Sequence, residues 1–151
     1  MEISAEVVKE LRDKTGVSVM ECKKALVEAQ GDMEKALRIL QERSVAMALK
    51  KQGRDLGAGT VAAYVHTTGQ VGALVLLSCE TDFVSKNEEF VALARDIAMH
   101  ISAMRPADHD DLFAQPFVKD EGKTIADLVS AATQKFGERI DVKGFSCWSV
   151  R

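Results

Sequence analysis

The 151-residue sequence lacks several features that would place it in a common functional class. No apolar run approaches the ~20 residues of a membrane-spanning helix, and the acidic N-terminus, MEISAEVVKELRDK, is unlike a signal peptide. The formal net charge of −3 lacks the basic excess that nucleic-acid binding usually requires. The three cysteines include no Cys-x-x-Cys pair, which is typical of reduced thiols in a cytoplasm. We therefore expect a cytoplasmic protein without membrane or direct nucleic-acid contact.

Motifs of enzymatic chemistry are also absent from the sequence. It contains no glycine-rich phosphate loop, no G-x-S-x-G and no H-E-x-x-H. His66, His100 and His109 lack metal-ligand spacing, and His100 is expected at the boundary between core and solvent. Cys79 precedes two acidic residues, which would raise the pKa of its thiol, so it is expected to be a small buried residue rather than a nucleophile. We expect no enzyme, no catalytic residue, no cofactor and no metal site.

The first fifty residues carry the signals of three short helices. Ser4 can cap a helix that stops at Thr15-Gly16, since glycine often follows the last helical residue. Ser18-Val19-Met20-Glu21 has the form of a capping box and begins a second helix, which ends at Gly31. Asp32 can cap a third helix, which runs on into SVAMALKKQ. Because apolar residues recur at helical steps, we expect a compact bundle.

Beyond these helices the pattern changes to that of strands. Three glycines within seven positions mark residues 52–59 as a linker. TVAAYVH (60–66) and VGALVLLSC (71–79) are separated by Thr67-Thr68-Gly69-Gln70, so they predict a hairpin. The second run is almost entirely apolar, which predicts a central strand covered on both faces.

Two further helices are predicted after the hairpin. Apolar residues from Phe90 to Met104 recur at three- and four-residue steps, and the pattern stops before Pro106. Residues 106–123 have the composition of a loop. Thr124 can cap a second helix, which ends at Gly137.

The sequence closes with a strand-like segment, ERIDVKGFSCWSV (138–150). Its alternation is disturbed at Gly144-Phe145, which predicts a bulge or a two-sided strand. Together these patterns predict an α+β fold, with a three-helix bundle followed by a small three-stranded antiparallel sheet and two packed helices.

The tetrapeptide Thr81-Asp82-Phe83-Val84 lies between the hairpin and the first of these helices. Thr81 with Val84, or Ser85 with Glu88, can begin that helix, and the second pair has the capping-box form. In either case Phe83 lies in or just before the first turn. It could pack inward as a hydrophobic staple, or it could remain exposed as an anchor for a partner. The residues alone leave both alternatives open.

Three segments in one order resemble a known family. LRDKTGVSVMECKKALVEAQGDMEKAL (11–37), the Lys50-Lys51 pair and ETDFVSKNEEF (80–90) are similar to the elongation factor Ts family of bacteria and organelles. FGERI (136–140) is similar to a segment that this family usually writes Ile-Gly-Glu-Asn-Ile. Two specific motifs in the family's order make a chance similarity improbable.

The resemblance covers residues 1–105 and, more loosely, 113–150. It implies that residues 1–51 form a three-helix ubiquitin-associated-like module. A linker over 52–59 then leads to an α+β core of the dimerisation type over 60–151.

The sequence also departs from the family. Many members have a duplicated core or a long helical insertion after the first core helix, where this sequence has only residues 106–123, so we expect a minimal form. Lys143-Gly144-Phe145 stands where the family more usually has Arg-Arg-Phe. A homodimer, giving a 2:2 complex with the partner, is therefore left open.

By resemblance, the protein is a guanine-nucleotide exchange factor that acts on GDP-bound elongation factor Tu. The resemblance implies that Asp82 and Phe83, framed by Thr81 and Val84, wedge between helices of the partner's nucleotide domain and disturb its magnesium site. It also implies a docking surface on the N-terminal module formed by Leu11, Arg12, Val19 and Met20.

Alternatives remain for both the docking residues and the function. Leu11 and Met20 could instead belong to the core of the bundle. A second hypothesis is a Ts-like binding protein that grips a partner without driving exchange. A third is a nucleic-acid-associated protein that uses the basic residues of the helix over 43–54.

Overall fold

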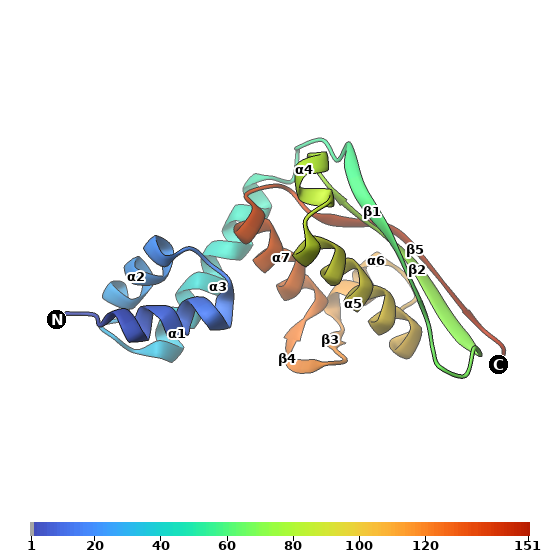
Figure 1. The fold of residues 1–151 in the computed structure, drawn as a ribbon, viewed down its shortest axis with the longest axis horizontal. Coiled ribbons are helices and arrows are strands. Elements are labelled where there is room, and N and C mark those ends of the chain that lie inside the picture. Colours follow the sequence, from blue (N-terminus) through green and yellow to red (C-terminus); the bar gives the residue numbers. More distant parts are fainter. Residues whose placement is uncertain (1) are drawn as a thin grey trace.

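The computed structural model describes residues 2–151 and begins with three helices (Figure 1). These are α1 (Ala5–Thr15), α2 (Val19–Glu28) and α3 (Met33–Lys50). Ser4, Ser18 and Asp32 each accept a hydrogen bond from a backbone N–H of the first turn, as predicted. The capping box at Ser18 is only half formed, because the Glu21 carboxylate pairs with Lys24 and Arg43 instead of turning back.

The bundle has a hydrophobic core of its own. Glycine at position 16 adopts the left-handed conformation that ends α1, so the chain can turn sharply into α2. The side chains that fill the core come from all three helices and their turns. They are Val8, Leu11, Val17, Cys22, Ala25, Leu26, Ala29, Ala36 and Leu40.

The C-terminal part is built on an antiparallel sheet with the strand order β1 (Ala58–Val65), β2 (Val71–Cys79) and β5 (Asp141–Ser149). The predicted hairpin and central strand are confirmed. β1 begins inside the predicted linker, and Gly59 belongs to the strand. A Cβ at Gly59 would lie 2.6 Å from the carbonyl oxygen of Leu77, so glycine permits this close approach of the backbones. The predicted bulge in β5 is also present, between the pairs Val142–Leu77 and Gly144–Leu76.

Helices cover only one face of this sheet (Figure 1). α5 (Glu88–Met104) packs on that face, and α7 (Ile125–Phe136) lies beside α5, where Phe90 and Phe136 meet edge to face. The prediction that β2 is covered on both faces is therefore wrong. Ala73, Val75 and Leu77 point into the core, whereas Leu74 on the opposite face is exposed.

Residues 106–123, predicted as a loop, contain further structure. They form α6 (His109–Ala114) and most of a hairpin of β3 (Pro116–Phe117) and β4 (Asp120–Thr124). His100 holds this segment, and its side chain is fully buried rather than at the core boundary. Its Nδ1 accepts a hydrogen bond from the Val118 N–H at 3.1 Å, so Nε2 carries the proton and donates to Gln115 at 2.9 Å.

The bundle lies against the core through α3 and α7. The Gln41 amide donates to Asp127, and the Ser44 hydroxyl donates to Gln134. At the end of α3, Lys51 Nζ donates to the carbonyl oxygen of Gly137 at 2.7 Å. These contacts fix the direction of α3 relative to the core. Within residues 2–151, no helix is both long and apolar enough to cross a membrane.

Candidate functional site

The tetrapeptide singled out in the sequence forms a separate helical turn at the end of β2. This turn is α4 (Asp82–Ser85), with Thr81 as the residue before its first helical position. Both predicted starts of the following helix are wrong, because α5 is capped by Asn87, whose side chain accepts from the Glu89 N–H at 2.8 Å. Residues 86 and 87 therefore separate α4 from α5, and α4 does not continue the axis of α5.

The underside of α4 is fixed to the core. Val84 is buried against the sheet and α5. Thr60 of β1 donates its hydroxyl to the Ser85 carbonyl oxygen at 3.0 Å. The Ser85 hydroxyl in turn donates to the carbonyl oxygen of Asp82 at 3.1 Å. These contacts hold the backbone of α4 in one position on the core.

The upper side of α4 presents Asp82 and Phe83 to solvent. The Phe83 residue is 93% exposed, which excludes the hydrophobic-staple alternative. A phenylalanine is normally at least partly buried, so a fully exposed ring on a fixed turn is a typical interaction anchor. The Asp82 side chain beside it is exposed as well.

Cys79, directly below this turn, is not a reactive thiol. It is buried, and its Sγ donates to the carbonyl oxygen of Thr81 at 3.2 Å. Burial, with a further contribution from the nearby Glu138 carboxylate, raises the pKa of the Cys79 thiol. The expectation of a small buried residue is confirmed.

The predicted docking residues on the bundle divide into two groups. Met20 is 66% exposed and Val19 is 52% exposed at the start of α2, and Arg12 is exposed on α1. Arg12 and Val19 line a shallow groove between these helices. The prediction that Leu11 belongs to the docking surface is wrong, because its side chain is fully buried in the bundle core. It supports the surface from beneath and offers no contact to a partner.

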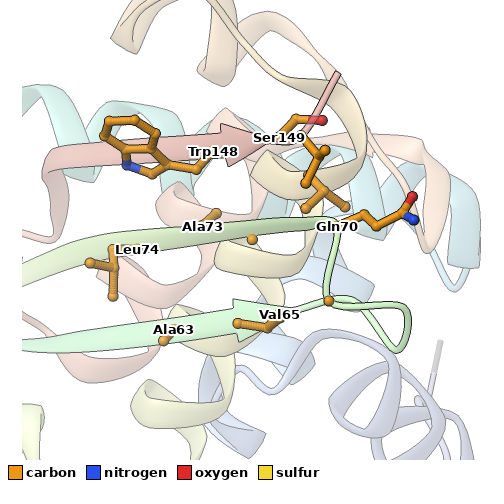
Figure 2. A pocket seen from close by; sticks show the side chains of 11 residues that line it. Ala63, Val65, Gln70, Ala73, Leu74, Trp148 and Ser149 are labelled. Carbon is orange, nitrogen blue, oxygen red and sulfur yellow. The ribbon is translucent and has the colours of Figure 1, made fainter.

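Sequence reasoning missed an exposed apolar face on the sheet. Val61 and Val65 of β1, Leu74 of β2 and Trp148 of β5 all lie on the face opposite the helices. Figure 2 shows Trp148, Leu74 and Val65 on three adjacent strands around a shallow groove. The Trp148 residue is 79% exposed. Apolar residues occupy both faces of the strand over 61–65, with Val61, Ala63 and Val65 on the face opposite Ala62, and this could have indicated the second apolar face.

These features define an α+β scaffold that carries three exposed surfaces. Among residues 2–151, no group of three or more His, Cys, Asp and Glu side chains could hold a metal ion. The three surfaces are the exposed Asp82-Phe83 turn, the start of α2 and the open face of the sheet.

Comparison with known proteins gives the family. Residues 80–150 match the family described as Elongation factor TS. Elongation factor Ts of Desulforamulus reducens is 40% identical, over 95% of this chain and 87% of that protein. The corresponding proteins of Thermosipho melanesiensis and Leptospira biflexa are 38% and 40% identical, over 98% and 99% of this chain and 98% of each relative. The chain belongs to the elongation factor Ts family.

The relatives differ from this chain in size. The three alignments extend over 189 to 195 residues, whereas this chain has 151, so each relative contains residues without a counterpart here. This agrees with the expectation of a minimal form of the family.

Proposed function

We propose that the protein is a guanine-nucleotide exchange factor that binds GDP-bound elongation factor Tu and promotes GDP release and GTP loading. The observation that carries the proposal is the fully exposed Phe83 on a fixed turn, within the segment that matches the family. Nothing in the packing of this chain requires an aromatic ring at that place. A partner that buries the ring supplies the reason.

The chemistry of the turn fits the weakening of a bound nucleotide. A nucleoside diphosphate is held by phosphate-binding amides and by a magnesium ion between phosphate and protein. Phe83 can enter an apolar pocket between helices of the partner, which brings the Asp82 carboxylate with it. A carboxylate close to the magnesium site competes with the groups that hold the cation. The two binding equilibria are coupled reciprocally. The exchange factor lowers the affinity of elongation factor Tu for GDP by the same ratio by which GDP lowers the affinity of elongation factor Tu for the exchange factor.

A single side chain cannot supply the whole effect. Loosening a nucleotide about 10⁴-fold requires about 5.5 kcal/mol of differential binding, and a buried phenylalanine provides about 2 to 3 kcal/mol. The rest must come from further contacts, for which the exposed Val19 and Met20 with Arg12 are suited. The α3–α7 contacts hold this second surface at a fixed position relative to α4, which raises the effective concentration of one contact once the other is made. We propose residues 1–51 and 60–151, each with its own core, as the two contacting units.

The direct test is the release of fluorescently labelled GDP from elongation factor Tu in the presence of this protein. Accelerated release that saturates with protein concentration is expected. Binding without faster release would support the alternative of a Ts-like partner protein and would contradict the exchange function.

The open face of the sheet supports a homodimer, which gives a 2:2 complex with elongation factor Tu. Apolar side chains from three adjacent strands, with Trp148 the most exposed, are more than isolated surface residues. A second copy can cover this face with the same face, as a two-fold interface does. Trp148→Lys is expected to produce a monomer in sedimentation experiments, whereas Val27→Lys on the bundle keeps the dimer. A monomeric wild type at micromolar concentration would contradict the proposal.

The remaining properties follow from the same proposal. The protein acts in the cytoplasm, catalyses no covalent chemistry and needs no cofactor. It makes no direct contact with nucleic acid, which the net charge of −3 supports. Retention on RNA near physiological salt would contradict this last point.

A further inference from the structure

Two glutamates connect the turn that leads into Asp82 and Phe83 with the neighbouring turn before β5. Each glutamate carries its carboxylate on one turn and accepts backbone N–H groups of the other turn. Glu138 lies in the turn between α7 and β5, and Glu80 lies directly after β2. One carboxylate oxygen of Glu138 accepts both the Glu80 N–H, at 3.1 Å, and the Thr81 N–H, at 3.0 Å. Its other oxygen accepts the Thr81 hydroxyl at 2.7 Å.

The reverse half of the arrangement uses the Glu80 carboxylate. One of its oxygens accepts the Arg139 N–H at 2.6 Å, and the other faces the Arg54 guanidinium at 3.5 Å. The two turns meet where the β2–β5 pairing ends, at the Ser78–Asp141 pair. The side chains thus continue the connection between the strands after the backbone pairs stop.

This arrangement determines how Thr81 can contribute to α4. A threonine before the first turn normally caps the helix, but Thr81 makes no such bond here. Its hydroxyl donates to Glu138 instead, and its N–H is bound to the same carboxylate. The backbone that enters α4 is therefore oriented by Glu138, a residue 57 positions further along the chain. Phe83 cannot orient itself, because its ring has almost no contacts of its own.

We propose that Glu138 is a positioning residue for exchange, which holds the Asp82-Phe83 turn at the angle that the partner's pocket requires. This inference rests on the proposed exchange function. Glu138 accepts three hydrogen bonds from Glu80 and Thr81, so losing its carboxylate frees the entry to α4. Val84 and Thr60 still hold the far end of the turn. The protein stays folded while the wedge loses its direction.

The test compares Glu138→Ala with Glu138→Gln in the labelled-GDP assay. Glutamine keeps the geometry without the charge, because its amide oxygen accepts both N–H groups and its NH₂ donates to the Thr81 oxygen. With Glu138→Ala, the maximal release rate at saturating factor is expected to fall about tenfold or more. Glu138→Gln is expected to keep the rate within about threefold of wild type. Glu121→Ala, which removes an exposed glutamate on β4, is the matched control and leaves the rate unchanged.

Two further readouts separate positioning from general loss of structure. The concentration of factor at half-maximal rate stays near the wild-type value in Glu138→Ala, because the surface at Met20 is untouched. Amide hydrogen exchange at Glu80 and Thr81 becomes faster, while the amides of α5 stay protected. If Glu138→Ala does not fold, Glu138→Asp, which withdraws the carboxylate by one methylene, carries the same test with the same expected fall in rate.

The inference is overturned by an unchanged maximal rate in Glu138→Ala, or by a Glu138→Gln variant as slow as Glu138→Ala. It is also overturned if the amides of Glu80 and Thr81 exchange no faster in the alanine variant. The wild-type rate reports the exchange function, and the ratio of variant to wild type reports the role of Glu138. A wild type that binds without accelerating release therefore refutes the exchange function itself, whereas an unchanged ratio refutes only the positioning role.

Discussion

Replacing Phe83 by alanine separates the two roles that an apolar side chain can have. The residue is 93% exposed, so the substitution removes almost no contact within the folded protein. Exposed positions without special roles change the free energy of unfolding by about 0.5 kcal/mol or less. We therefore expect Phe83→Ala to have the thermal unfolding midpoint of the wild type.

The same substitution is expected to be costly in the complex. Fully burying a phenylalanine side chain contributes about 2 to 3 kcal/mol. If the ring enters its pocket only as the nucleotide loosens, this free energy is lost from the release step. One factor of ten corresponds to about 1.4 kcal/mol, so GDP release should slow about 30- to 150-fold at a given factor concentration.

The assay measures release of fluorescent GDP from elongation factor Tu over a range of factor concentrations. Leu49→Ala is the matched control, because Leu49 is a large exposed side chain on α3 and does not belong to the Asp82-Phe83 turn. It should release GDP as the wild type does. Wild-type rates for Phe83→Ala would refute the wedge, and an unfolded Phe83→Ala would refute the conclusion that the ring is free of the core.

Three further changes test other parts of the structure. Met20→Ala is expected to raise the factor concentration at half-maximal GDP release several-fold while the maximal rate stays the same, because it removes a docking contact and not the wedge; a lower maximal rate would contradict this. Gly59→Ala should lower the unfolding midpoint measured by circular dichroism, since the added methyl meets a backbone oxygen of β2 at 2.6 Å; an unchanged midpoint would show that the strands separate easily. Burial lowers the pKa of His100 from its ordinary value of 6.5, so its contribution to stability is lost as the pH falls below that value. Burial alone would lower the pKa of His109 as well, but the hydrogen bond and charge of Asp141 raise it, so its contribution is present at acidic pH and lost as the pH rises above 6.5. His109→Gln should therefore lose more stability than the wild type between pH 7 and pH 5 in thermal unfolding experiments, and equal losses would contradict these opposed shifts.

The helices and the three-stranded sheet could be predicted because their signals are local. Ser4, Asp32 and Thr124 cap the helices that the sequence predicts, and the apolar periodicity of each helix needs only its own residues. The small hairpin of β3 and β4 could not be predicted in this way. Its strands are short and mostly exposed, and it is held by the buried His100, which lies in α5.

In the candidate site, too, the sequence predicted what has a local signal and left open what depends on packing. The sequence indicated Asp82 and Phe83 through a motif, but it left open whether the ring points inward or outward. It also placed Leu11 with the docking residues, although the packing of three helices buries that side chain. Neither orientation can be derived from spacing, since both depend on which other elements cover the residue.

The sequence by itself determined the three N-terminal helices, the two core helices, the three-stranded sheet, the family and the segment proposed to contact the partner. The tertiary structure decided which of those residues reach solvent and what holds them there. Glu138 lies far from Thr81 along the chain, and the pairing of β2 with β5 brings their turns together. Short-range backbone preferences can be inferred from neighbouring residues, whereas exposure and the hydrogen bonds between distant turns exist only after the chain has packed.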